Sequence, residues 1–127
     1  MPASRPLLLR VAPLSENLVL ARTVAASVCA QLDFPIDQLD DVRLAVDEAC
    51  SLLLSETDGS DLDVEFLPGD GELTVTVSGG TNAAAGPSDS SFAWLVISEL
   101  CDSATAELSE GRLTVRLQSV RRGVTVG

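Results

Sequence analysis

Apolar residues recur along the chain at two spacings, one typical of helices and the other of strands. Repeats of three and four residues predict a helix over residues 15–32, capped by Ser15 with Glu16 in its first turn. They predict a second helix that is capped near Asp37 and ends at the turn over residues 57–60. The apolar face of the first consists of Leu18, Ala21, Ala25, Val28 and Leu32, and that of the second of Leu39, Val42, Val46, Ala49 and Leu53.

Alternating apolar and polar residues predict five strands and the overall architecture. The strands are expected over residues 7–11, 62–66, 73–77, 104–108 and 113–117, and the last four form two hairpins around Asp70-Gly71 and Glu110-Gly111. A loop over residues 79–90, rich in Gly, Ala, Ser and Pro, leads to a third helix over residues 91–101. The order strand–helix–helix–strand–strand–helix–strand–strand predicts an α+β fold. We expect a two-layer sandwich of a mixed or antiparallel sheet with its helices on one face.

The length and composition indicate one domain. With 127 residues, of which 46% are apolar, the chain is long enough to bury a core of its own. We expect this domain to occupy residues 1–120. A short tail over residues 121–127 follows it, and we expect this tail to be frayed from Arg121 and Arg122 onward.

The charge pattern bears on the kind of partner. The net charge is −11, every cationic side chain is an arginine, and there is no histidine. The commonest general base and the commonest zinc ligand are therefore both missing. An acidic surface repels nucleic acids and anionic membranes, so we expect direct contact with neither. It suits a basic protein partner, unless it serves only to keep the protein in solution.

Cysteine usage and the N-terminal segment both predict a cytoplasmic protein. Cys29, Cys50 and Cys101 lie far apart in apolar helical segments, with no CxxC pair and no metal-ligand spacing. We therefore expect core residues in a reducing cytosol, and no metal site. The apolar run over residues 7–9 lies between Arg5 and Arg10 and is too short for a signal sequence or a membrane span.

The first 50 residues resemble the start of the RsbW/SpoIIAB family, bacterial anti-sigma factors that are also serine kinases with the GHKL ATPase fold. Three motifs carry the resemblance: L-S-x-N-x-x-x-A-R, A-Q-L-D and V-x-E-A. The matching residues are Leu14, Ser15, Asn17, Ala21 and Arg22, then Ala30 to Asp33, and then Val46, Glu48 and Ala49. Further along, the resemblance rests on element order and on Leu100-Cys101-Asp102. The segment over residues 91–94, SFAW, is similar to the actinobacterial branch of the family.

The resemblance also shows where the ATP chemistry of the family is missing. In the family, a carboxylate at the position of Glu48 activates the attacking hydroxyl, and an Asn four residues later holds magnesium. Here that later position is Leu52, and a leucine side chain has no oxygen to offer a hard cation. Glu48 is therefore predicted to be vestigial, a solvated helix carboxylate without a catalytic role.

Two further positions of the nucleotide site differ from the family. Gly79 occupies the place of the Asp that recognises adenine, and Ser91 and Ala93 occupy the place of the glycine pair that cradles phosphates. The intervening loop is short, which predicts a reduced ATP lid. Phe92 and Trp94 are expected to fill the core or the pocket rather than to form a stacking platform. Together these differences predict no bound cofactor and no kinase activity.

The first helix matches the family pattern most fully, so we expect it to carry the partner-binding face. Its candidate residues are Glu16, Asn17, Val19 and Arg22. The resemblance implies that Arg22 contacts both a sigma factor and the antagonist that displaces it, a task that suits the planar guanidinium fork. The alternative is an ordinary surface arginine that pairs with an acidic residue of its own chain.

These observations predict a degenerate anti-sigma factor that sequesters an RNA polymerase sigma factor. The resemblance implies a homodimer and release by an anti-anti-sigma protein. Three alternatives stay open. Glu48 supports an active serine kinase with divergent ATP contacts, the vestigial pocket could serve a small-ligand sensor, and the partner of the module could be something other than a sigma factor.

Overall fold

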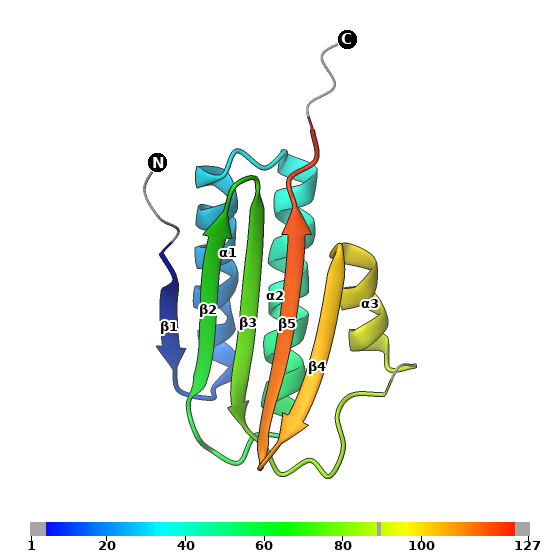
Figure 1. Cartoon of the computed structure of the whole chain (residues 1–127). Coiled ribbons are helices and arrows are strands. Elements are labelled where there is room, and N and C mark those ends of the chain that lie inside the picture. The colour runs from blue at the N-terminus through cyan, green and yellow to red at the C-terminus, as the bar shows by residue number, and fades with distance from the viewer. Residues whose placement is uncertain (1–4, 89, 124–127) are drawn as a thin grey trace.

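The computed structural model describes residues 5–88 and 90–123 and has the predicted order of elements (Figure 1). Its five-stranded sheet has the strand order β1-β2-β3-β5-β4, and every pairing in it is antiparallel. The strands are β1 (Leu7–Val11), β2 (Leu62–Gly69), β3 (Glu72–Gly80), β4 (Ser103–Ser109) and β5 (Arg112–Val120). The helices are the short 3₁₀ helix η1 (Ser15–Asn17), α1 (Leu18–Gln31), α2 (Ile36–Ser55) and α3 (Phe92–Leu100).

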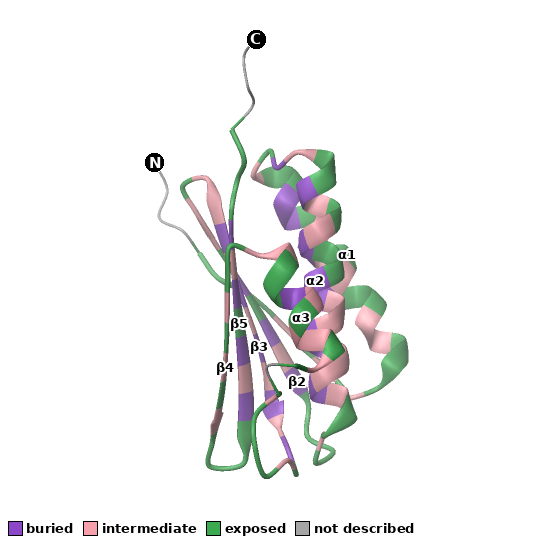
Figure 2. Cartoon of the chain, turned by 90° about the vertical axis from the view of Figure 1, so that its right-hand side faces the viewer, coloured by how far each residue is buried: buried purple, intermediate pink, exposed green. Residues whose placement is uncertain are grey.

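The three α-helices cover one face of the sheet, and the core lies between the two layers (Figure 2). The alternating strand residues point toward the helices, as the sequence predicts, and Val64, Phe66 and Val77 are fully buried. The removal of each such side chain from water stabilises the fold by about 1.5–3 kcal/mol. The predicted α+β sandwich is therefore confirmed. Among the described residues, no helix is both long enough and apolar enough to span a membrane.

Both long helices begin differently from the prediction. Ser15 lies in η1 and does not cap α1, whose first residue is Leu18. Helix α2 begins at Ile36, directly after Pro35, and Asp37 lies in its first turn instead of at its cap. Pro35 is the N-cap residue of α2, with φ −56° and ψ 149°, and no side chain forms a capping hydrogen bond at this end of the helix. Asp37 still stabilises the helix, because its negative charge lies near the positive end of the helix dipole.

The helix-free face of the sheet is polar and carries an ion-pair network. Asp63 on β2 accepts hydrogen bonds from Arg10 Nε at 2.6 Å and from Arg112 Nη2 at 3.2 Å. The hydrogen bond from Arg10 is the main reason why the pKa of Asp63 lies below its usual range. Since both arginine side chains are largely exposed, the network orients these residues and adds little stability.

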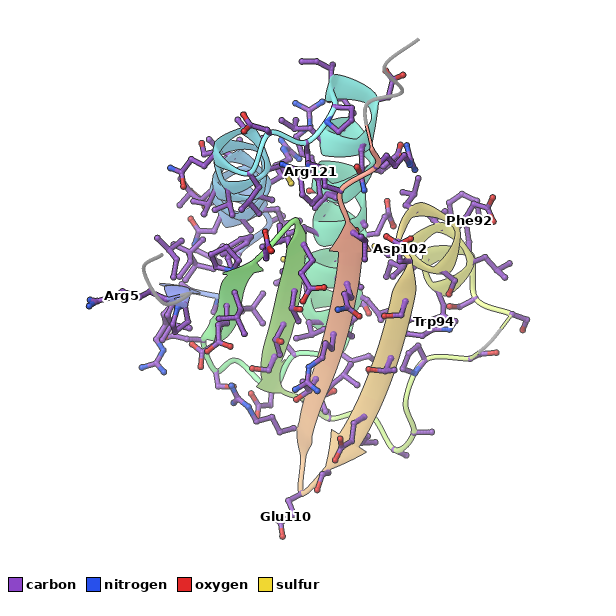
Figure 3. All side chains as sticks on the ribbon, turned by 45° about the horizontal axis from the view of Figure 1, so that its top comes forward. Arg5, Phe92, Trp94, Asp102, Glu110 and Arg121 are labelled. Carbon is purple, nitrogen blue, oxygen red and sulfur yellow. The ribbon has the colours of Figure 1, made fainter. Side chains whose placement is uncertain are left out.

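The chain after β5 is held in place at Arg121 and Arg122, so the prediction that it frays from these two residues is wrong; residues 124–127 of the predicted tail lie outside the described part of the chain. Gln38 on α2 is buried, and its Nε2 donates to the Val120 carbonyl at 2.7 Å while its Oε1 accepts from the Arg122 amide at 2.9 Å. The Arg121 guanidinium donates to the Leu32 carbonyl at 3.1 Å (Figure 3). Helix α2 therefore holds the end of β5 in place through the hydrogen bonds of Gln38.

Replacement of Gln38 should measure the value of this anchor. We expect Gln38→Ala to lower the free energy of unfolding by about 1–3 kcal/mol, because it removes the two hydrogen bonds that this buried side chain makes with the Val120 carbonyl and the Arg122 amide. Urea denaturation provides the measurement. Gln31→Ala, at the exposed end of α1, is the control and should cost less than about 0.5 kcal/mol. Equal effects at the two positions would show that the anchor contributes nothing to stability.

Candidate functional site

The residues that the sequence assigns to the nucleotide site begin on the second half of α2. Glu48 is half-buried, and within the described ranges no arginine lies at salt-bridge distance from its carboxylate. Leu52, one helical turn later, is also half-buried and packs against the core. The position that the sequence analysis assigns to the magnesium ligand is therefore an apolar contact between the helix and the core.

Gly79 lies near the end of β3 in a space that has no room for a side chain. A β-carbon added there would lie 2.8 Å from Cδ2 of Leu62 and 3.6 Å from Cδ2 of Leu53. Both leucines are buried, one on β2 and the other on α2, so neither can swing into solvent to make way. Close packing between the helix and the sheet therefore favours glycine here, and an aspartate at this position would have to displace the buried side chain of Leu62.

A small hollow is found at the C-terminal end of α2, between this helix, the loop after β3 and the start of β5. Its volume is about 160 Å³, and its lining consists of Leu52, Ser55, Glu56, Ala83, Ala85, Gly86, Pro87 and Leu113. Ligand pockets for small molecules usually enclose about 300–1,000 Å³. Leu52 is the one predicted site residue that lines this hollow; Glu48, Gly79, Ser91 and Ala93 do not.

The start of α3 is capped by its own chain. Ser91 is the N-cap residue, and its hydroxyl accepts a hydrogen bond from the backbone amide of Trp94 at 3.2 Å. One of the amides that could face a phosphate at a helix N-terminus is therefore already occupied. Ala93, at the other predicted phosphate position, is half-buried.

The two aromatic residues of α3 have different environments, and the prediction for one of them is wrong. Trp94 is half-buried and packs against the core, as expected. Phe92 is 79% exposed (Figure 3). Every position from Phe92 to Ile97 is apolar, so the hydrophobic pattern could not show which side of the helix faces the sheet.

The candidate partner-binding arginine lies at the contact between α1 and α2. Nη1 of Arg22 is 3.0 Å from Oδ1 of Asp47, and the arginine side chain is still 43% exposed. The two residues lie in a shallow groove of about 430 Å³, here called the Arg22 groove. It is lined by Arg22, Asp40, Asp41, Arg43, Leu44 and Asp47. Arg22 thus forms the ion pair within its own chain that was the alternative to partner contact, and much of its guanidinium stays open to solvent.

The other three candidates on this face have different roles. Glu16 is exposed on η1, and Val19 on α1 is 44% exposed. Asn17 is half-buried, and its Nδ2 donates to the Ala12 carbonyl at 3.0 Å, so this side chain secures the entry to α1. Leu20, beside Val19, is 48% exposed and was missed by the sequence analysis. Adjacent apolar residues at the start of a helix were the available signal, because both cannot face the core.

The acidic half of the Arg22 groove was also missed. Asp40 pairs with Arg43 at 2.9 Å, and Asp41 lies 3.5 Å from Arg122. The first of these pairs has the spacing of one helical turn and could have been found from the sequence. The pairing of Arg22 with Asp47 joins two helices and leaves no local signal.

The cysteines do not provide reactive groups. Burial raises the pKa of the Cys29 thiol and of the Cys50 thiol to about 12, and that of the half-buried Cys101 thiol to about 11. At neutral pH all three are protonated, so none acts as a thiolate nucleophile or ligand. Within residues 5–88 and 90–123, no group of three or more acidic or cysteine side chains is placed to hold a metal ion.

Comparison with known proteins identifies curated relatives of this chain. No family model matches the chain. Two curated relatives are 34% identical to it over 95 residues, which is 74% of this chain and 56% of each relative. Both are named anti-sigma-F factor RsbW and come from Mycobacterium tuberculosis, strains CDC 1551/Oshkosh and H37Rv. The chain is a homologue of RsbW. The resemblance that the sequence analysis finds in the first 50 residues is confirmed.

The RsbW homologue spans about half the length of the curated relatives it matches. Its fold is shared with a crystal structure of the RsbU and RsbW domains of a Mycobacterium tuberculosis protein. The TM-score is 0.75, and the match covers 94% of this chain and 34% of that one. The sequences are 16% identical in this comparison, so the likeness concerns the fold alone.

An aspartate at position 79 should destabilise the RsbW homologue. We expect Gly79→Asp to lower the free energy of unfolding by about 3 kcal/mol or more, because it pushes a charged side chain against Leu62 and Leu53. Gly86→Asp adds the same charge where an added β-carbon meets nothing within 4 Å, and should change stability by less than about 0.5 kcal/mol. Similar urea midpoints for both variants would show that the space around Gly79 opens readily.

Proposed function

We propose that this chain is an anti-sigma factor that sequesters an RNA polymerase sigma factor by protein–protein binding and performs no phosphoryl transfer of its own. The observation that carries the proposal is the packing of Leu53 and Leu62 around Gly79 in a chain related to anti-sigma-F factor RsbW. The relationship supports the partner, and the packing supports a function without ATP.

Residues of the kind that would hold Mg-ATP are missing at each of three contacts. Leu52 offers no oxygen to the metal, position 79 has no room for an adenine-recognising carboxylate, and Ser91 occupies an amide at the start of α3. Glu48 alone can neither position phosphates nor neutralise their charge. The residues present do not fit the nucleotide that the fold family implies, and no reaction step is assigned to them.

The exposed part of Arg22 supports a binding role. A guanidinium has five donors, and a single hydrogen bond to Asp47 occupies one of them. A partner carboxylate could take the remaining donors or replace Asp47. Since the pair is partly exposed, breaking it costs less than about 1 kcal/mol. The apolar side chain of Val19, one turn before Arg22 on α1, would add contact area to this face.

The remaining expectations follow from the family and from the charge. A homodimer, release by an anti-anti-sigma protein and a cytoplasmic location accord with the relationship to RsbW. The net charge of −11 supports a protein partner and disfavours direct contact with nucleic acid or with an anionic membrane surface. Without its own kinase activity, the chain would depend on another kinase, on expression level or on a ligand to change partners.

Titration with Mg-ATP separates this proposal from an active kinase. Isothermal titration calorimetry should show no binding tighter than about 1 mM, because the three contacts above are missing. Leu52→Asn, which returns an oxygen ligand to α2, should not restore binding, because position 79 stays closed. Magnesium-dependent binding below the millimolar range, with phosphate transfer to a protein serine, would establish the kinase instead.

Affinity capture tests the partner, and a variant of Arg22 tests the binding face. Capture from the native cell, followed by mass spectrometry, should recover a sigma factor. With that purified factor, Arg22→Ala should weaken binding about 30-fold or more, equivalent to about 2 kcal/mol. Its free energy of unfolding should fall by less than about 1 kcal/mol.

Arg116→Ala is the matched control for this measurement. Arg116 is an exposed arginine of β5, and its neighbours in the chain, Val115 and Leu117, are buried against the helices, so it lies on the opposite side of the sheet. Its removal should leave the affinity unchanged. If Arg22→Ala and Arg116→Ala bind equally well, Arg22 serves only its internal pair with Asp47.

A further inference from the structure

A second, apolar groove runs between α2 and α3. It has a volume of about 510 Å³ and is here called the α2–α3 groove. It is lined by Leu44, Phe92, Leu95, Val96, Glu99 and Leu100. Phe92 is 79% exposed, Leu95 54% and Leu44 46%. Single exposed apolar residues are common on protein surfaces, whereas a contiguous group in one hollow marks an interaction site.

The shape of the groove suits a helix. Helices α2 and α3 pack side by side on one face of the sheet and run in opposite directions (Figure 1). An α-helix fits the space between two packed helices by placing a stripe of side chains between theirs. The exposed side chains of Phe92 and Leu95 lie three residues apart on α3, so they form one ridge against which such a stripe can pack.

The acidic residues beside the groove indicate which charges an occupant should carry on either side of its apolar stripe. Glu99 lines the groove, and Glu48 follows Leu44 by one turn on the same side of α2. Within the described residues, neither Glu48 nor Glu99 has an arginine at salt-bridge distance. An occupant with Lys or Arg beside its apolar stripe would pair with these carboxylates.

The same charges argue against a second copy of this chain as the occupant. Two copies packed through this groove would bring Glu48 and Glu99 of one protomer toward those of the other, and each copy has a net charge of −11. Juxtaposed like charges oppose association, and their effect grows when apolar contacts exclude water.

We propose that the α2–α3 groove is a docking site for an amphipathic helix of a partner protein, with Lys or Arg flanking its apolar stripe. This surface lies on elements other than the α1 face assigned above, so the proposal goes beyond sigma-factor sequestration through Arg22. The two surfaces adjoin, because Leu44 lines both the Arg22 groove and the α2–α3 groove. A partner that covers both would contact three helices.

A model peptide tests the groove without knowledge of the natural partner. The probe is a fluorescein-labelled helix of about 18 residues, with leucines at helical spacing and lysines elsewhere. Fluorescence anisotropy should give a Kd on the order of 10 μM for the full chain. A scrambled peptide of the same composition keeps the charge and loses the stripe, and a glutamate version keeps the stripe and inverts the charge. Both should bind at least tenfold more weakly.

Variants of the protein locate the binding. Phe92→Ser and Leu95→Ser remove exposed side chains, so both variants should fold normally. Each should weaken the binding of the peptide at least tenfold. Ile36→Ser is the matched control, because Ile36 is 73% exposed at the start of α2 and does not line either groove. Thermal unfolding followed by the fluorescence of Trp94, the single tryptophan, verifies that each variant is folded.

The outcomes separate this proposal from the proposed function. Equal binding by wild type, Phe92→Ser and Leu95→Ser, or by the ordered and scrambled peptides, would overturn the groove proposal and leave sequestration through Arg22 untouched. Failure to capture a sigma factor would overturn the proposed function and leave the peptide result standing. A wild-type dimer that Phe92→Ser dissociates in sedimentation would identify a second copy as the occupant and so contradict the proposal.

Discussion

Helix α2 packs closely against the sheet at Gly79, a residue of β3 that has no side chain. Leu53 from the helix and Leu62 from the neighbouring strand close the space around Gly79. This contact joins the two layers through apolar carbon atoms, at the position that the sequence analysis assigns to the recognition of adenine. In the described part of the chain, every buried side-chain nitrogen and oxygen has a hydrogen-bond partner. These buried side chains therefore find their hydrogen-bond partners within the protein itself.

The same helix carries three kinds of surface because its side chains rotate by about 100° per residue. Val42, Val46 and Leu53 face the core, Asp47 faces α1 and borders the Arg22 groove, and Leu44 faces outward between the two grooves. Contacts on the outer sides can therefore change without disturbing the core. A binding protein built on this scaffold depends on α2 for its stability and for both of its proposed surfaces.

The sequence predicts those parts of the structure that repeat locally. Alternation places Val64, Phe66 and Val77 in the core, and helical spacing does the same for Val46, because each signal lies within one element. The outcome at Arg121 could not be predicted from the sequence, because the chain around it is held by Gln38, 82 residues before Val120. Pairings between distant segments leave no trace in local pattern.

The site shows the same division. Leu52 and Gly79 could be recognised as departures from the family by their side-chain chemistry alone. The close packing that disfavours a carboxylate at position 79 could not be predicted from the sequence, because it depends on Leu62 from another strand. Phe92 was assigned to the core wrongly, since a helix that is apolar on all sides has no periodicity to orient it. The packing of α3 against the sheet decides which of its apolar residues are exposed, and this packing is known only from the structure.

The two grooves differ in how their charges are satisfied, and this difference suggests a division of work. In the Arg22 groove each aspartate already has an arginine: Asp47 has Arg22, Asp40 has Arg43 and Asp41 has Arg122. A partner there must exchange one ion pair for another, which adds little net affinity and discriminates strongly between geometries. In the α2–α3 groove the carboxylates of Glu48 and Glu99 have no such arginine among the described residues, and the floor is apolar. The free energy of binding there would become more favourable both through the release of water from apolar side chains and through the formation of new ion pairs. Affinity would then arise mainly from the side of α3 and selectivity mainly from the side of α1.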